Sequence, residues 1–247
     1  MSDFELNLQI SANNDDCWGY SPNLLVATVV IGAGRYEIGD DWEGSGLRFS
    51  NITVPGGSII REAYLVVTGY RYGDEGSVDT CNTRISAEKE DNPRDFTNDN
   101  WTSFSARWAN RTTARVDWNS IPHFSTGVEY QSPDIKTVIQ EIVNRAGWAS
   151  GNSMVLFWDD FEQRSTPTVR ARRFGYPYNV SPSQAAKLNI THNPHGYKLD
   201  AKGLYIPYED LNGEKKLHVL LKNLSPTSKA AGEGGEVVIE VTYEPAA

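Results

Sequence analysis

The stretch GLRFSNITVPGGSIIREAYLVV, residues 46–67, decides the fold of this chain. Two apolar runs are separated by a Pro-Gly-Gly break, and nothing in the stretch indicates a catalytic residue. Successive side chains of an extended chain point to opposite faces. Leu47 and Phe49 therefore share one face of the first run, and Leu65 and Val67 share one face of the second. Because proline and paired glycines interrupt a sheet, the pattern predicts two strands and a connection between them.

The same type of pattern recurs through residues 1–193. Short apolar runs are separated by turns rich in Gly, Asn, Asp and Pro, which is typical of a β-sandwich rather than of alternating strands and helices. The chain has 12 Tyr, 7 Trp and 8 Phe, and aromatic residues suit the half-buried surface of a pleated sheet. The predicted strands are residues 3–10, 24–31, 46–53, 59–72, 82–88, 114–118, 153–158, 168–174 and 186–191.

Only one segment, SPDIKTVIQEIVNRAG at residues 132–147, has a clear helical pattern. We expect Ser132 to cap it, Asp134 to complement the positive end of the helix dipole, and Gly147 to end it. Its apolar residues recur at helical spacing, and this stripe predicts one face packed on a sheet as ordinary core. The stripe consists of Ile135, Val138, Ile139 and Ile142.

The character of the chain changes at HNPHGY, residues 192–197. Three further strands are predicted after it, at residues 199–208, 215–222 and 235–243. A piece of roughly fifty residues buries little surface by itself, and this one has no cysteines that could stabilise it. We therefore divide the chain into a sandwich domain, residues 1–193, and a small β appendage, residues 194–247, that packs on the sandwich or on a neighbouring subunit.

Charge and hydropathy exclude several classes of function. The net charge of −9 argues against a nucleic-acid partner, because phosphate binding needs clustered Lys and Arg. No run approaches the roughly 18 apolar residues of a membrane span, so membrane insertion is not expected. The start, MSDFELNLQIS, lacks the features of a signal peptide. We expect a chain that works in the cytoplasm, is released by lysis inside a particle, or has lost a leader.

Two smaller sets of residues have structural interpretations. Arg170, Arg172 and Arg173 form the one basic cluster, and their alternation along a predicted strand indicates a solvated face or a row of salt bridges. Cys17 and Cys81 are the only cysteines. They either form a disulfide, which would contribute about 4 kcal/mol over so long a loop, or remain as two buried thiols.

The sequence contains no convincing catalytic motif. IGAGRYEIG, residues 31–39, follows an apolar strand, but Glu37 stands where a dinucleotide-binding loop needs its third glycine. Acidic clusters at residues 13–16, 39–44, 98–100 and 158–162 offer the oxygens that calcium prefers, without the spacing of an EF-hand. Asp159 and Asp160 are adjacent, so on a strand they would point to opposite faces and would not serve one site.

Aromatic residues are the other candidates for binding. If exposed, several of them could stack on sugar rings, although most buried aromatic residues in any protein belong to the core. The candidates are Trp18, Tyr20, Trp42, Tyr70, Tyr72, Trp101, Trp108 and Trp148.

The chain resembles a family of jelly-roll modules. In these modules the segment corresponding to residues 46–67 reads as a strand, then P-x-G, then a second strand that begins near Ala63. The similarity continues through ARVDWNSIPHFSTGVEYQSPDIKTVIQEIVNRAGWASGNSMVLFW and ends with AAKLNITHN, so that it covers about residues 8–193. Such modules include carbohydrate-binding modules of the DNRLRE type in bacterial surface proteins, and they also resemble segments in structural proteins of tailed bacteriophages.

The resemblance implies a jelly-roll β-sandwich of two antiparallel sheets with one packed helix, followed by the small C-terminal β domain. It implies a virion accessory protein without catalytic activity, such as a head decoration, a fibre or a tail adhesion component. The implied partners are its own subunits, capsid or tail proteins and host surface glycan, and the implied location is the virion. The alternative is a secreted carbohydrate-binding module or adhesin of a bacterial surface protein, located outside the cell or on its surface.

The same resemblance suggests site residues. Family members with an acidic N-terminal loop imply Asp15 and Asp16 as calcium ligands, and their aromatic-rich loops imply Trp18 and Trp42 as glycan-binding residues. No cofactor other than calcium is implied, and no residue is assigned a catalytic role.

Overall fold

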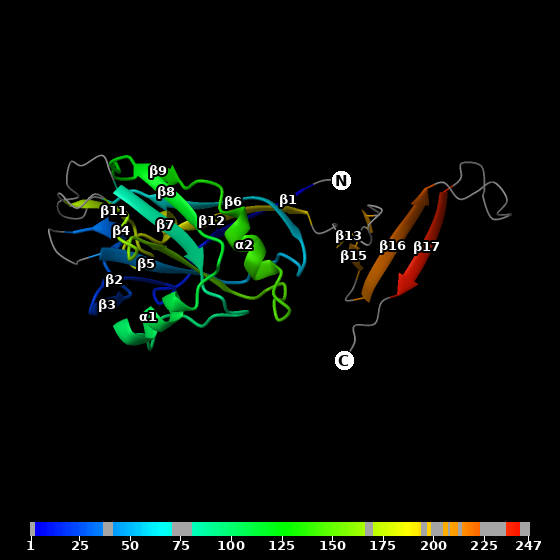
Figure 1. Cartoon of the computed structure of the whole chain (residues 1–247), viewed down its shortest axis with the longest axis horizontal. Coiled ribbons are helices and arrows are strands. Elements are labelled where there is room, and N and C mark those ends of the chain that lie inside the picture. The colour runs from blue at the N-terminus through cyan, green and yellow to red at the C-terminus, as the bar shows by residue number, and fades with distance from the viewer. Residues whose placement is uncertain are drawn as a thin grey trace.

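Two antiparallel sheets face each other and form the predicted all-β sandwich (Figure 1). The computed structural model describes residues 3–36, 42–70, 81–165 and 170–193, and the backbone of five later strands between residues 197 and 242. The smaller sheet of the sandwich has four strands in the order β1-β12-β6-β9. These strands span Phe4–Gln9 (β1), Lys187–Asn193 (β12), Ile59–Thr68 (β6) and Glu129–Gln131 (β9).

The larger sheet has eight strands. Six follow the order β11-β4-β5-β10-β7-β8, while β2 pairs with both β5 and β3. The strands span Asp16–Tyr20 (β2), Asn23–Val26 (β3), Ile31–Arg35 (β4), Trp42–Phe49 (β5), Cys81–Ala87 (β7), Val116–Ile121 (β8), Met154–Asp159 (β10) and Ala171–Gly175 (β11).

The stretch at residues 46–67 links the two layers. Its first strand, β5, belongs to the large sheet and its second strand, β6, to the small one, so the connection crosses the sandwich rather than forming a hairpin. Val54 in this connection is fully buried, and its carbonyl accepts a hydrogen bond of 3.0 Å from Trp148 Nε1. Gly57 has φ +73°, a left-handed conformation that glycine adopts without steric cost. The Pro-Gly-Gly break is therefore the turn that takes the chain from one sheet to the other.

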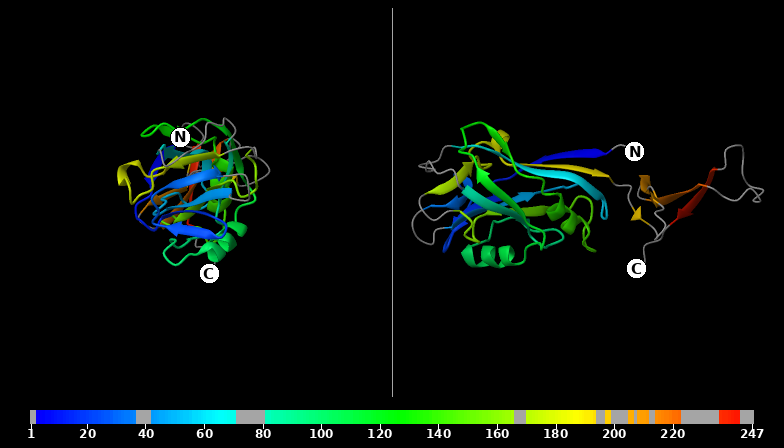
Figure 2. Two further views of the ribbon diagram at one scale, coloured as in Figure 1. Left: turned by 90° about the vertical axis from the view of Figure 1, so that its left-hand side faces the viewer. Right: turned by 45° about the horizontal axis from the view of Figure 1, so that its top comes forward.

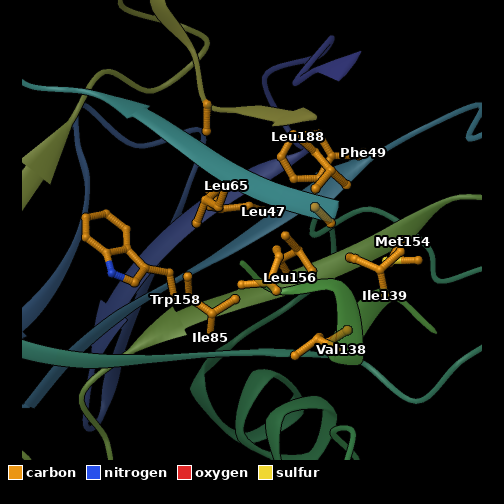
Figure 3. Close-up of a cluster of buried hydrophobic side chains, with 14 of the residues drawn as sticks. Leu47, Phe49, Leu65, Ile85, Val138, Ile139, Met154, Leu156, Trp158 and Leu188 are labelled. Carbon is orange, nitrogen blue, oxygen red and sulfur yellow. The ribbon is translucent and has the colours of Figure 1, made fainter. Parts of the chain in front are cut away.

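The core lies between the two sheets and follows the alternation of each strand (Figure 3). Leu47 and Phe49 from β5 and Leu156 from β10 meet Leu65 from β6 and Leu188 from β12 across the layers. Each of these five side chains is fully buried, and burying an aliphatic or aromatic side chain of this size contributes about 1.5–3 kcal/mol. The faces predicted from residues 46–67 are confirmed.

Helix α2, Lys136–Val143, packs against β6 and β7 and so contacts both sheets at one end of the sandwich. The predicted apolar stripe is confirmed, since all four of its residues are fully buried. The predicted cap is wrong. Ser132 Oγ accepts a hydrogen bond from Leu65 N at 3.0 Å, and Asp134 Oδ1 accepts one from Ala63 N at 3.1 Å. Both side chains bind the free edge of β6, and the helix begins only at Lys136. The prediction for Asp134 is confirmed, because its Oδ1 also accepts from Lys136 N at 2.9 Å and so lies at the positive end of the helix.

A second helix, α1, spans Trp101–Ala109 and was not predicted. It lies outside the sandwich, against the outer face of the large sheet (Figure 2). Asn100 Oδ1 accepts from Ser103 N at 3.1 Å while Ser103 Oγ accepts from Asn100 N at 3.0 Å, a reciprocal capping box. The prediction of a single helix is therefore corrected to two in the described part of the chain.

The strands after residue 193 pair with one another. β13 and β14 form a two-stranded sheet, and β15, β16 and β17 form a three-stranded antiparallel sheet. The predicted strands 215–222 and 235–243 are confirmed by β16 and β17, whereas most of the predicted strand 199–208 lies outside the described residues. These strands span Tyr197–Lys198 (β13), Tyr205–Ile206 (β14), Tyr208–Leu211 (β15), Glu214–Lys222 (β16) and Glu236–Thr242 (β17).

Two of the three arginines in the basic cluster, Arg172 and Arg173, do not lie on a solvated face, contrary to one of the two predictions for the cluster. Arg173 is 1% exposed, and its guanidinium donates to the carbonyl groups of Ile121 and Pro122 at 2.7 and 2.6 Å. Arg172 is also buried and forms a salt bridge with Glu43 at 3.0 Å. These arginines satisfy buried carbonyl and carboxylate groups at the end of the large sheet.

Of the two alternatives for the cysteines, the structure has the free thiols. Cys17 on β2 and Cys81 on β7 are both buried and unpaired with each other. Neither helix in the part of the chain that the structure describes has the length and apolar character needed to span a membrane.

Candidate functional site

A second apolar layer separates α1 from the outer face of the large sheet. Phe104 from α1 packs on Phe157 of β10, with ring centroids 5.6 Å apart, and on Phe96 from the preceding loop. Gly46 on β5 makes room for this layer, because a Cβ there would lie 2.5 Å from Phe96 Cζ. Gly44, two residues earlier on the same face, likewise leaves space for an aromatic ring of the turn after β10.

A pocket of about 340 Å³ opens beside this layer. Its walls come from four separate segments: the turn after β2, the start of β5, the exposed side of α1 and the turn after β10. Most of the lining is aromatic, and hydroxyl and amide groups lie among the rings. The lining residues are Ser21, Trp42, Trp101, Phe104, Ser105, Trp108, Ala109, Phe161 and Gln163.

Phe161 is the ring around which the aromatic wall is organised. It meets Trp101 at 5.6 Å and 83°, and Trp108 at 5.5 Å and 89°, both edge-to-face. Edge-to-face pairs contribute about 0.5–1.5 kcal/mol beyond their buried area. All three rings are only partly buried, so the wall that these contacts hold together is accessible from solvent.

Trp108 is held by two further contacts. The Arg111 guanidinium lies 3.6 Å from the centroid of the indole ring, a cation–π contact, and Arg111 also forms a salt bridge with Glu162 at 2.6 Å. The indole Nε1–H donates to Asp159 Oδ2 at 3.0 Å. These contacts leave the Trp108 ring little rotational freedom.

Asp159 is the carboxylate behind this wall. It is 2% exposed, and burial raises its pKa to about 7 against the lowering effect of hydrogen bonds from Trp108 and from Phe161 N. Burial also raises the pKa of the neighbouring Asp160, to about 6. Asp160 binds a different group, the backbone N–H of Arg164 and Ser165. The two adjacent carboxylates therefore serve separate sites, as the sequence predicted.

The two tryptophans suggested as glycan-binding residues lie in different places. Trp42 lines the pocket, and Arg35 stacks over its ring at 5.0 Å. Trp18 is 8% exposed and packs edge-to-face on Tyr20 and Phe174 in a separate small cluster. Only Trp42 is thus part of the pocket.

Asp15 and Asp16, the suggested calcium ligands, are both buried and both bind protein groups. Asp15 Oδ1 forms a salt bridge with Arg48 at 2.7 Å, and Asp16 Oδ2 accepts from Tyr178 N at 2.7 Å. Burial raises the pKa of Asp16 to about 7. Among the residues whose positions the structure describes, no group of three or more His, Cys, Asp or Glu side chains is arranged to hold a metal ion.

Sequence reasoning named Trp101 and Trp108 among many aromatic candidates but did not single them out, and it missed Phe161 and Gln163. One local signal was present: Asn100 and Ser103 stand at capping-box spacing before Phe104. That signal predicts a helix that contains both tryptophans. It does not indicate that the helix would face Trp42, which lies about sixty residues away in the sequence.

Comparison with known proteins adds no family to this description. No protein-family model matches the chain, and no curated protein matches it.

Proposed function

We propose that this chain is a non-catalytic attachment protein whose sandwich binds carbohydrate in the aromatic pocket beside α1. The observation that supports it most is the convergence of Trp42, Trp101 and Trp108 from separate segments on one accessible cavity. Ring faces are electron-rich and attract the C–H groups on the face of a sugar ring. The hydroxyl and amide groups of Ser21 and Gln163 can exchange hydrogen bonds with sugar hydroxyls. A cavity of about 340 Å³ is in the range of small-ligand sites.

The burial and the hydrogen bonds of three carboxylates also favour binding over hydrolysis. Paired catalytic carboxylates must face one cleft across a defined gap. Asp159, Asp160 and Asp16 have raised pKa values, but each is fully or largely buried and hydrogen-bonded to a backbone N–H group of its own turn or of a neighbouring loop. Burial alone explains their raised pKa values, and the hydrogen bonds that they accept give each of them a structural role.

We further propose that the protein acts as an accessory component of a virus particle, with its own subunits and capsid or tail proteins as partners. The resemblance to phage structural segments supports this role. So do the two small sheets after residue 193, because a piece of roughly fifty residues buries little surface unless it packs on another one. The alternative, a secreted carbohydrate-binding module of a bacterial surface protein, would use the same pocket as a monomer.

Binding is tested by screening the purified chain on a glycan array and measuring each hit by titration calorimetry. We expect dissociation constants in the micromolar range. Trp101→Ala should weaken binding at least tenfold, that is by about 1.4 kcal/mol. Trp18→Phe is the matched control, because Trp18 lies outside the pocket, and it should bind as the parent does. Absence of any glycan hit, or equal loss in both variants, would contradict carbohydrate binding at this pocket.

Assembly is tested by measuring the molar mass in solution with light scattering. The chain mass is 27.5 kDa. A closed oligomer of the full chain that becomes a monomer when residues 194–247 are removed supports the particle role. A monomer at micromolar concentration that binds glycan supports the secreted module instead.

A further inference from the structure

Two walls of the aromatic pocket depend on one buried acceptor. Asp159 Oδ2 accepts the indole N–H of Trp108 at 3.0 Å, and Asp159 Oδ1 accepts the backbone N–H of Phe161 at 3.1 Å. Trp108 belongs to α1 and Phe161 to the turn after β10, and both line the pocket. The carboxylate therefore joins the helix to the turn directly behind the ligand-facing rings.

The residues next to Asp159 in the large sheet do not compete with its two hydrogen bonds. On β5 the residue opposite is Gly44, and on β7 it is Arg84, whose guanidinium pairs with Asp117 at 2.7 Å and with Glu162. The charged groups that act on Asp159 are Arg111 after α1, which favours the ionised form, and Glu162 in its own turn, which opposes it. Both side chains are engaged with each other by a salt bridge of 2.6 Å.

Protonation would change the hydrogen bonds that Asp159 can accept. An ionised carboxylate accepts through both oxygens, whereas a protonated one carries a hydroxyl, which is a donor and a weaker acceptor. Both partners of Asp159 are N–H donors, so a proton on either oxygen faces a donor and one of the two hydrogen bonds is weakened. The connection between Trp108 and Phe161 is then weakened on one side.

We propose that Asp159 is the positioning residue of the aromatic pocket, and that its ionised form fixes Trp108 for ligand binding while its protonation loosens that wall. Carbohydrate affinity then falls as the pH falls through neutrality. The proposal rests on the function proposed above and adds a regulation to the same site. The burial of Asp159, which raises its pKa to about 7, places the change in the physiological range.

The first experiment needs no ligand. The protein is labelled with ¹⁵N on its indole groups, and the Trp108 Nε1–H signal is identified by its absence in Trp108→Phe. We expect this signal to shift with a midpoint near pH 7. Asp159→Asn should remove the shift, because its amide is neutral at every pH. Asp160→Asn is the matched control: it removes an adjacent buried carboxylate that contacts neither ring, so the Trp108 titration should persist.

The second experiment measures occupancy with phenyl β-glucoside, a probe small enough for the cavity, by saturation-transfer NMR. Wild type should bind about tenfold more weakly at pH 5.5 than at pH 8.5, which corresponds to about 1.4 kcal/mol. Asp159→Asn should bind at both pH values as wild type does at pH 5.5, since one of its two groups is an N–H donor. Asp160→Asn should follow wild type.

The outcomes separate this proposal from the proposed function. An indole signal that does not move between pH 5 and 8.5, a shift that survives in Asp159→Asn, or equal probe affinity at both pH values overturns the role of Asp159. If the probe binds at neither pH, carbohydrate binding is contradicted, and the role of Asp159 is still decided by the indole titration. Should Asp159→Asn fail to fold, the Asp160→Asn variant tests the link: loss of the indole titration there overturns the assignment.

Discussion

Replacement of Arg107 by methionine tests whether buried ion pairs hold α1 on the sandwich. Arg107 is 9% exposed, and its guanidinium makes a bidentate contact with Glu88 at 3.0 and 2.7 Å and a salt bridge with Asp99 at 2.5 Å. It also donates to the carbonyl groups of Arg94 and Asp95. All five N–H groups of an arginine thereby have acceptors.

Methionine has a similar length and leaves this set of acceptors without a cation. Removing one partner of a buried ion pair costs about 3–5 kcal/mol, because the remaining charge stays buried without compensation. We expect Arg107→Met to lower the free energy of unfolding by that amount. Arg94→Met is the matched control, since Arg94 also pairs with Asp99, at 2.7 Å, but its side chain is 54% exposed. An exposed pair contributes about 0–1 kcal/mol.

Urea unfolding followed by tryptophan fluorescence measures both variants. The pH dependence of the free energy of unfolding supplies a second check, through the ionisation of Asp99. Burial alone would raise the pKa of Asp99, but hydrogen bonds from Ser103, Arg94 and Arg107 outweigh it and lower the pKa below 3.8. Its stabilising contribution is therefore complete above pH 3.8 and is lost as the pH falls further. A cost below about 1 kcal/mol, or one equal to that of Arg94→Met, would refute the reasoning.

Three further predictions concern stability and reactivity. Gly46→Ala should cost about 1–3 kcal/mol in thermal unfolding, because its methyl would lie 2.5 Å from a ring carbon, and Gly56→Ala, with nothing nearer than 3.4 Å, should be nearly neutral. Burial raises the pKa of Asp16 to about 7, so its contribution to the free energy of unfolding falls as the pH rises from 3.8 to 7. Asp16→Asn should therefore reduce the difference between the free energies of unfolding at pH 5 and pH 8, and an unchanged difference would contradict this. Burial raises the thiol pKa of Cys17 and Cys81, so a thiol reagent should label neither in the native protein and both in urea, and rapid native labelling would contradict their burial.

Much of the sandwich could be predicted from local pattern. The alternation of Leu47 and Phe49, and of Leu65 and Val67, was enough to place the inward faces of β5 and β6, because strand side chains alternate whatever the neighbours are. The stripe of α2 was predicted for a similar reason, since helical spacing brings apolar residues to one side. The start of α2 was not, because Ser132 Oγ accepts from the backbone of β6, a distant segment, instead of from the first turn of the helix.

Helix α1 escaped prediction because its buried face is not apolar. The two side chains it buries are Phe104 and Arg107, and arginine is seldom buried unless it is paired. The partner Glu88 lies at the end of β7, nineteen residues earlier in the chain. A pattern read within nine residues of helix contains no information about that carboxylate.

The sequence by itself determined the layers, because the period of two along each strand is a property of the chain. The pocket was decided only by the tertiary structure. The sequence does not distinguish Trp18 from Trp42. In the structure Trp18 packs in a separate cluster, whereas Trp42 lines the cavity with Trp101 and Trp108. The same holds for Asp159, whose raised pKa comes from burial behind α1. Accessibility and dielectric surroundings depend on which distant segments fold over a residue, and no local pattern carries that information.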